Sequence, residues 1–194
     1  MKNNCDICKA KLSGNILSLG KQPLCDDLRR IGSSKKNKLY KIELKLCKKC
    51  LTVNQLHKVD QEILFPKKYN YRAALTKDVQ EGMKDFANKV NSLIKKKNKT
   101  VLDIGCNDGS LLNFFKKKKF KTFGVEPTNA YKDCSKSHII FNEYFTKKSV
   151  KKILKKNSYI DVVTFTNVFA HIPNFQELIK NLKLLIPNIN YLVI

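Results

Sequence analysis

Several features are missing from this chain of 194 residues, and each absence removes a class of protein. No stretch approaches the roughly 18 consecutive apolar residues that a membrane-spanning helix needs. The first residues, Met1 to Cys5, contain no apolar segment of the kind that a secretory signal carries. We therefore expect a cytoplasmic protein without a membrane partner. The chain also lacks internal repeats and a low-complexity linker, and it gives no indication of the oligomeric state.

Arginine is scarce although the chain is strongly basic. The formal net charge is +23, yet only Arg29, Arg30 and Arg72 are arginines among 39 basic residues. Proteins that read nucleic acid tend to use arginine forks for base edges. The lysines are spread over the whole chain, with short runs at 95–97, 116–119 and 155–156. This distribution favours solvated helix faces over a nucleic-acid groove.

A disulfide framework is not expected either, because the chain shows no export signal. Four of its seven cysteines fall in two pairs, Cys5-x-x-Cys8 and Cys47-x-x-Cys50. A two-residue spacer lets both thiolates of a pair turn onto one ion, so the two pairs predict a tetrahedral structural Zn²⁺ site. The long spacer between them must hold a β-hairpin or more. A redox role would require a thioredoxin-like βαβ context, which is absent.

The periodicity of apolar residues divides the chain into three regions. Residues 1–66 are turn-rich, with strands expected at 16–19 and 39–46, and form a small β-rich zinc-binding domain with little core of its own. Residues 67–98 form a linker and a bridging helix at 76–97, which Thr76 can cap. Residues 99–194 alternate short apolar strands with helices, which predicts an α/β fold with a parallel sheet covered on both faces. The expected strands lie at 100–104, 122–125, 138–141, 160–166 and 191–194, and the helices at 110–118, 146–156 and 175–186.

The segment 101–110 carries the clearest ligand signal. A buried strand ends at Asp103, and the chain then turns through Gly105 and Gly109 into a helix, whose first N–H groups are free to bind a ligand. Glu126 ends the following strand, where a carboxylate can accept hydrogen bonds from both ribose hydroxyls of an adenosine ligand.

The charges around this loop indicate which ligand it binds. Asp103 and Asp108 would repel the pyrophosphate of a dinucleotide, but they suit the ammonium and sulfonium groups of S-adenosylmethionine. We therefore predict a site for S-adenosylmethionine that also includes Asn107 of the loop. Asn142 and Asn167 follow later strands and belong to the same crevice, although each could equally well satisfy a turn.

Taken together, these motifs resemble the sugar C-methyltransferases of deoxysugar biosynthesis. Members of that family carry an N-terminal zinc-binding domain followed by a Rossmann-like class I methyltransferase domain. The resemblance covers essentially the whole chain, and the order of the motifs is more specific than any one of them. The matching stretches are residues 5–8, 22–24, 47–50, 69–72, 101–112, 124–127 and 166–172.

The resemblance implies methyl transfer to carbon 3 of a nucleotide-linked 4-keto sugar through an enolate. It places His171 in the catalytic crevice, as the base or as a group that stabilises the enolate; the alternative is a histidine that caps a helix or packs in the core. It also implies that Tyr69, Tyr71 and Arg72 line the substrate side, with Arg72 a candidate for a phosphate or keto oxygen. Packing between domains is the alternative for the two tyrosines.

One departure from the family concerns length. Family members continue beyond the strand that matches residues 191–194 with further sheet strands, a catalytic Tyr-x-Glu-His stretch and a domain that covers the sugar. We therefore expect this chain to be the N-terminal part of a longer enzyme, with the first five strands of the sheet and a hydrophobic strand exposed at its edge. The alternatives are a zinc-containing protein that binds or modifies RNA, and a truncated module without catalytic activity.

Overall fold

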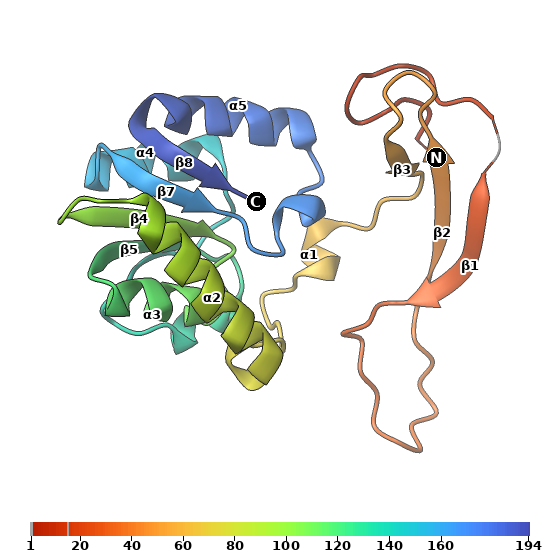
Figure 1. Ribbon diagram of the computed structural model, residues 1–194. Coiled ribbons are helices and arrows are strands. Elements are labelled where there is room, and N and C mark those ends of the chain that lie inside the picture. Colours follow the sequence, from red (N-terminus) through yellow and green to blue (C-terminus); the bar gives the residue numbers. More distant parts are fainter. Residues whose placement is uncertain (1, 15) are drawn as a thin grey trace. The chain divides into compact units, whose positions relative to one another are not determined.

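A computed structural model describes residues 2–14 and 16–194, which form two compact units (Figure 1). The first unit runs to Leu64 and includes Pro173–Gln176. The second unit comprises Phe65–Ile172 and Glu177–Ile194.

The first unit is built on a small antiparallel sheet. Its strands β1 (Leu17–Pro23), β2 (Leu39–Leu46) and β3 (Val53–Gln55) lie side by side in that order, and the helical turn α1 (Gln61–Leu64) follows. The β1–β2 hairpin lies between the two cysteine pairs, as the long spacer predicts. Every residue of β1 is exposed to solvent, and the buried apolar cluster of the described part of this unit is confined to Cys5, Leu12, Cys47 and Leu56. The sheet therefore encloses almost no core.

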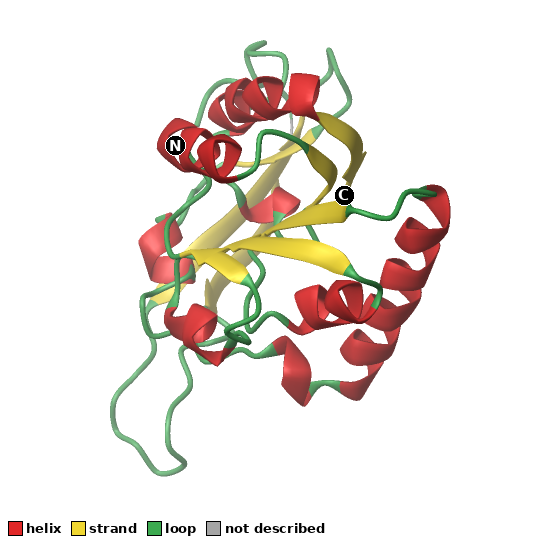
Figure 2. Ribbon diagram, turned by 90° about the vertical axis from the view of Figure 1, so that its left-hand side faces the viewer, coloured by secondary structure: helices red, strands yellow, loops and turns green. Residues whose placement is uncertain are grey.

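The second unit is a five-stranded parallel sheet with helices on both faces (Figures 1 and 2). The strand order is β6-β5-β4-β7-β8, which confirms the predicted α/β fold. The strands are β4 (Lys99–Ile104), β5 (Phe120–Val125), β6 (Ile139–Phe141), β7 (Ile160–Thr164) and β8 (Ile189–Val193). The helices are α2 (Lys77–Leu93), α3 (Ser110–Lys117), α4 (Lys147–Lys156) and α5 (Phe175–Leu185), and the 3₁₀ turns are η1 (Ala73–Leu75), η2 (Asn129–Asp133), η3 (Phe169–His171) and η4 (Ile186–Asn188).

Aromatic packing fixes α2 and α3 on one face of this sheet. Phe115 of α3 is fully buried and makes edge-to-face contacts with Phe86 of α2 and Phe120 of β5, at ring-centroid distances of 6.3 and 5.1 Å. Val150 and Ile153 of α4 are also fully buried. With helices on both faces, the central strands are apolar on both sides, as a parallel sheet requires. Among the described residues, no helix is both long and apolar enough to cross a bilayer.

Three sequence expectations need correction. The helix expected to reach residue 97 ends at Leu93, because Ile94 takes an extended conformation and buries its side chain in the core. Thr76 stands at the N-cap of that helix, but its side chain makes no capping hydrogen bond. The strand expected to reach residue 166 ends at Thr164, because the chain reverses shortly afterwards at Asn167, which has a φ of +57°.

Replacing Phe115 tests the importance of this packing. We expect Phe115→Ala to lower the free energy of unfolding of the second unit by about 3–5 kcal/mol, because it removes a fully buried ring and leaves a cavity. Denaturant titration followed by circular dichroism at helical wavelengths measures the change. The neighbouring Phe114 is only half-buried, so Phe114→Ala is the matched control and should cost clearly less. Equal losses in the two variants would contradict the assignment of Phe115 to the core.

Candidate metal centre and ligand crevice

The two cysteine pairs adopt the same backbone turn. In the first, the N–H of Cys5 donates to the carbonyl of Ala10 (2.9 Å), and the N–H of Lys9 donates back to Cys5 (3.1 Å). In the second, Cys47 donates to Thr52 (2.9 Å), and Leu51 donates back to Cys47 (2.8 Å). The residue after each second cysteine has a positive φ, +62° at Lys9 and +59° at Leu51. Each turn thereby directs two thiols to the same side of the loop.

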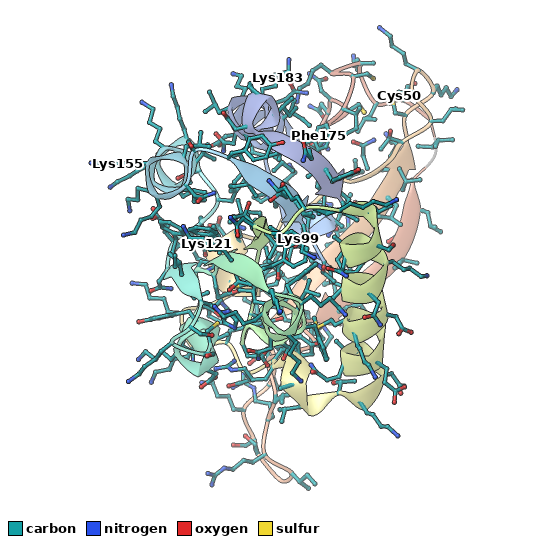
Figure 3. All side chains as sticks on the ribbon, turned by 60° about the vertical axis from the view of Figure 1, so that its left-hand side comes forward. Cys50, Lys99, Lys121, Lys155, Phe175 and Lys183 are labelled. Carbon is teal, nitrogen blue, oxygen red and sulfur yellow. The ribbon has the colours of Figure 1, made fainter. Side chains whose placement is uncertain are left out.

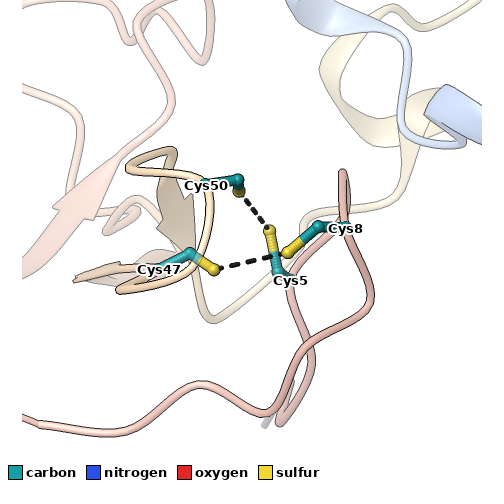
Figure 4. Close-up of side chains that lie close together, drawn as sticks. All are labelled: Cys5, Cys8, Cys47 and Cys50. Atoms are coloured by element: carbon teal, nitrogen blue, oxygen red, sulfur yellow. Dashed lines mark hydrogen bonds between the residues drawn. The ribbon is translucent and has the colours of Figure 1, made fainter.

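The four thiols converge on one point (Figure 4). All four sulfur atoms lie within 4.8 Å of one another, with Sγ–Sγ distances of 3.6 Å between Cys5 and Cys50 and 3.5 Å between Cys8 and Cys47. A tetrahedral zinc with Zn–S bonds of about 2.3 Å requires sulfur atoms about 3.8 Å apart. The geometry of Cys5, Cys8, Cys47 and Cys50 therefore fits Zn²⁺.

Asn54 on β3 links the two cysteine turns, and no sequence pattern indicates this role. Its side chain is buried, and its amide nitrogen donates to the sulfur of Cys5 (3.5 Å) and to the carbonyl of Thr52 (2.9 Å). Its amide oxygen accepts from the N–H of Asp6 (2.9 Å). Contacts of this kind orient the ligands of a metal and disperse the charge of a thiolate.

The ligand crevice lies where the parallel strands of the second unit end. Asp103 is paired with Gly124 of β5 on one side and with Thr164 of β7 on the other, so the carboxyl ends of β4, β5 and β7 are adjacent. Glu126 follows β5 directly, and Asn167 follows β7. Asn142 follows β6, which pairs with β5, so all four predicted residues lie at one edge of the sheet. Ligands of open parallel sheets bind at this edge.

Gly105 sits where a side chain has no room. Its φ is +73°, and a Cβ atom there would lie 2.4 Å from Cγ2 of Val168, which folds over the loop from beyond β7. Gly109 has a φ of +77° and stands at the N-cap of α3. Both glycines are therefore required by the backbone, whether or not a ligand is bound.

Glu126 stabilises the loop between β4 and α3 through hydrogen bonds. Its two carboxylate oxygens accept from the backbone N–H groups of Asn107 (3.0 Å) and Thr128 (2.8 Å). Because each carboxylate oxygen can accept a second hydrogen bond, the predicted contacts with ribose hydroxyls remain possible. Asn142 donates to the backbone carbonyl of Glu126 (2.8 Å) and remains exposed, so it satisfies a turn and is also accessible to a ligand.

Residues 105–109 between β4 and α3 form what we call the cofactor loop, and residues 65–75 form what we call the strap. Asn107 and Asp108 connect the two. The amide oxygen of Asn107 accepts from the N–H of Ala73 (3.0 Å), and its nitrogen donates to the carbonyl of Tyr71 (3.2 Å). A carboxylate oxygen of Asp108 accepts from the N–H of Ala74 (2.8 Å). The side chain of Asn107 thus makes two contacts within the protein, which sequence reasoning did not foresee.

The strap carries the three residues predicted to face the substrate. Arg72 donates to a carboxylate oxygen of Asp133 (2.5 Å) and to the carbonyls of Tyr69 (2.6 Å) and Tyr71 (2.9 Å), so its guanidinium holds the strap in shape. The exposed ring of His171 lies 5.5 Å from the ring of Phe65, which lies 5.6 Å from Tyr69. Tyr69 and Tyr71 are 6.4 Å apart. Phe65, which the sequence did not single out, thus connects His171 with both tyrosines.

Two buried polar groups remain available at the crevice. The hydroxyl of Thr166, between β7 and Asn167, is buried and has no hydrogen-bond partner among the described residues. Asp103 is buried and accepts one hydrogen bond, from the hydroxyl of Thr164 (2.6 Å). Burial raises the pKa of Asp103 to about 7; the Thr164 hydrogen bond opposes this shift and the negative charge of Glu126 adds to it. A ligand with a positive charge would relieve this cost, so the crevice fits S-adenosylmethionine.

Zinc content tests the metal centre. We expect about one Zn²⁺ per chain, and we expect Cys47→Ser to lose the metal and unfold the first unit, because zinc binding replaces a core there. Elemental analysis and near-ultraviolet circular dichroism measure the two effects. Cys25 is exposed and lies outside the cluster, so Cys25→Ser is the matched control and should keep its zinc. A zinc-free wild-type chain with a folded first unit would refute the assignment.

The raised pKa of Asp103 predicts a pH dependence of stability in the ligand-free chain. Its folded pKa of about 7 lies above the ordinary value of 3.8, so the folded state binds the proton more tightly than the unfolded state. The contribution of Asp103 to stability is therefore full at low pH and is lost as the pH rises to about 7. Denaturant titrations from pH 5 to 8 should show a smaller decline in Asp103→Asn than in the wild type. Asp85→Asn on the exposed side of α2 should keep the wild-type slope.

Comparisons with known proteins agree with both predicted cofactors. The family model described as "Methyltransferase domain" matches residues 72–194, and the model described as "Putative zinc binding domain" matches residues 5–65. The methyltransferase model supports S-adenosylmethionine as a cofactor, and the zinc-binding model together with the four-cysteine cluster supports Zn²⁺. No curated protein matches the chain.

Among solved structures, the chain is similar to a SAM-dependent methyltransferase from Archaeoglobus fulgidus, with 22% identity and a TM-score of 0.47 over 58% of this chain and 49% of that one. It is also similar to the plantazolicin methyltransferase BpumL in complex with SAH, with 19% identity and a TM-score of 0.41 over 55% and 41% of the two chains. DesVI from Streptomyces venezuelae shows 16% identity and a TM-score of 0.32 over 50% and 44%. The aligned part thus spans less than half of each of these proteins. Because the methyltransferase model matches more than half of the sequence, the chain belongs to the methyltransferase-domain family, with a zinc-binding unit ahead of that domain.

Proposed function

We propose that this chain is part of an enzyme that transfers a methyl group from S-adenosylmethionine to carbon 3 of a nucleotide-linked 4-keto-deoxysugar. The observation that carries the proposal is the aromatic row His171–Phe65–Tyr69–Tyr71, whose neighbouring rings lie 5.5, 5.6 and 6.4 Å apart within the same unit as the cofactor loop. The order of motifs along the chain, which resembles the sugar C-methyltransferases, supports the same substrate class.

His171 provides the proton transfer in this proposal. Its imidazole is exposed at the end of η3, and Phe65 packs against its ring. It would accept the proton from the carbon next to the ketone, while the electrons of that C–H bond form the enolate of the sugar. The cofactor, when bound, supplies the electrophilic methyl group. Phe65 would hold the imidazole in one orientation, which a general base needs.

The strap would position the sugar relative to the methyl donor. Tyr69 and Tyr71 present flat rings of the kind that pack against sugar rings, and both lie on a segment fastened to the cofactor loop through Asn107. Arg72 would contribute mainly by holding the strap, because its guanidinium is engaged with Asp133 and two carbonyls. A direct contact with a substrate phosphate would need one of its remaining N–H groups.

Deuterium exchange tests the role of His171 without requiring complete turnover. We expect the wild-type chain, with S-adenosylhomocysteine and a thymidine-diphosphate-linked 4-keto-6-deoxysugar in D₂O, to exchange the proton at carbon 3, as followed by NMR. His171→Gln should reduce the exchange rate by about 100-fold or more, because it removes the base.

Two controls separate chemistry from folding. His57→Gln alters a histidine of the first unit. It should keep the exchange rate, since His57 contacts Glu43 of the same unit and His171 belongs to the second unit. The affinity of His171→Gln for S-adenosylhomocysteine, measured by calorimetry, should equal that of the wild type. Wild-type exchange in His171→Gln would exclude His171 as the base.

A further inference from the structure

The fold brings together lysines that are far apart in the sequence. Residues 86–102, 109–125 and 144–160 hold five, five and six lysines and no acidic residue. Each of these segments contains the end of a helix and the start of the next strand, namely α2 and β4, α3 and β5, and α4 and β7. Because β4 is paired in parallel with both β5 and β7, these three junctions meet at one edge of the sheet.

We call amino-edge lysines those that lie between the last turn of each of these helices and the first two residues of the next strand. They lie at the amino ends of the strands, opposite the edge that carries the ligand crevice, and Lys99, Lys121 and Lys155 are marked in Figure 3. Most are exposed, and the acidic residue that neutralises Lys96 (2.6 Å), Asp161, is fully buried. The set comprises Lys95, Lys96, Lys97, Lys99, Lys116, Lys117, Lys118, Lys119, Lys121, Lys155 and Lys156.

Aromatic rings hold several of these side chains at the surface. The ammonium of Lys99 lies 4.9 Å from the ring centroid of Phe120, that of Lys121 lies 5.2 Å from Phe123, and that of Lys96 lies 5.0 Å from Tyr159. Lys121 also donates to the side chain of Asn157 (3.2 Å), which joins the β5 and β7 junctions. These contacts reduce the entropy that the lysines would lose on binding a ligand.

Helix stability accounts for only part of this arrangement. Cations in the last turn of a helix are favourable because of the helix dipole, and Lys116 and Lys117 of α3 and Lys155 and Lys156 of α4 occupy such positions. Lys118, Lys119 and Lys121 lie beyond the last turn of α3, and Lys95–Lys97 lie beyond α2. Mutual repulsion of uncompensated charges costs stability, so the excess points to an anionic partner.

We propose that the amino-edge lysines form a docking surface for single-stranded RNA. Lysine binds phosphate as a point charge, and a flexible strand can follow the three junctions in turn. Tyr159 is 39% exposed at this edge and offers a ring on which a base can stack. Helices end at this surface and do not lie along it, so it has no element shaped to enter the major groove of a duplex.

A membrane surface fits these observations less well. Of the three apolar residues of the basic helix α4, Val150 and Ile153 are fully buried and Leu154 is half-buried, so the helix has no exposed apolar face to insert into a bilayer. RNA binding at this edge would not compete with the proposed sugar substrate, since the crevice lies at the other ends of the strands. The inference therefore stands independently of the proposed reaction.

Fluorescence anisotropy with a labelled oligouridine of about 20 nucleotides tests the surface. We compare the full chain with a quadruple variant, Lys117→Gln, Lys119→Gln, Lys121→Gln and Lys155→Gln. At about 100 mM KCl the variant should bind at least about tenfold more weakly, and its slope of log K against log salt should fall by about 3, since each lost phosphate contact contributes about 0.7. A matched control with the same loss of charge should change binding less than about twofold. It carries Lys77→Gln, Lys84→Gln, Lys147→Gln and Lys148→Gln, all at exposed positions away from this edge.

Three results would overturn the proposal. One is a wild-type dissociation constant weaker than about 10 µM, which is the range of nonspecific attraction. Another is an equal loss of binding in the control variant, which would mean that total charge and not the surface matters. The third is lysine-dependent sedimentation with phosphatidylserine vesicles in the absence of RNA binding, which would assign the surface to a membrane.

Discussion

The parallel pairing of β4 with both β5 and β7 is the constraint on which the second unit depends. It requires each connection to return across a face of the sheet as a helix, and it therefore gives the sheet two chemically different edges. At the carboxyl edge the chain presents Asp103 and Glu126, both buried. At the amino edge it presents lysines, because the helices end there. A different strand order would separate the carboxylates from one another and the lysines from one another, without any change in the sequence.

In the absence of a ligand, the two buried carboxylates at the carboxyl edge lower the stability of the fold. Asp103 and Glu126 are buried near each other, and burial together with the charge of Glu126 shifts the Asp103 carboxyl towards its neutral form. Glu126 offsets its own burial by accepting two backbone hydrogen bonds, whereas Asp103 accepts one from Thr164. Native proteins tolerate such unfavourable groups mainly at functional sites. A positively charged ligand would compensate the charge of the two carboxylates, which favours cations at this edge.

Much of this arrangement was predictable because it follows from local rules. The alternation of apolar strands and helices gave the fold, and the two Cys-x-x-Cys pairs gave the metal cluster, since both signals depend on residues close in sequence. Asn54, Phe65 and the side-chain contacts of Asn107 were not predictable in the same way. Each acts through a contact with residues far along the chain, such as the 34-residue separation between Asn107 and Ala73, and no local pattern encodes it. The lysines are spread over the whole sequence, and their concentration at one edge of the sheet follows only from the order of the strands.

Different interactions stabilise the two units. The second unit buries complete layers of apolar side chains, and its packing would hold without a metal. Among the described residues of the first unit, the buried apolar ones are two leucines and two of the cysteines, while leucines such as Leu17 and Leu39 remain exposed on the sheet. Negative charges on sulfur atoms at these distances repel one another, and a bound cation offsets that repulsion. We therefore expect metal binding and folding of this unit to be coupled, whereas the methyltransferase fold has a core that does not depend on zinc.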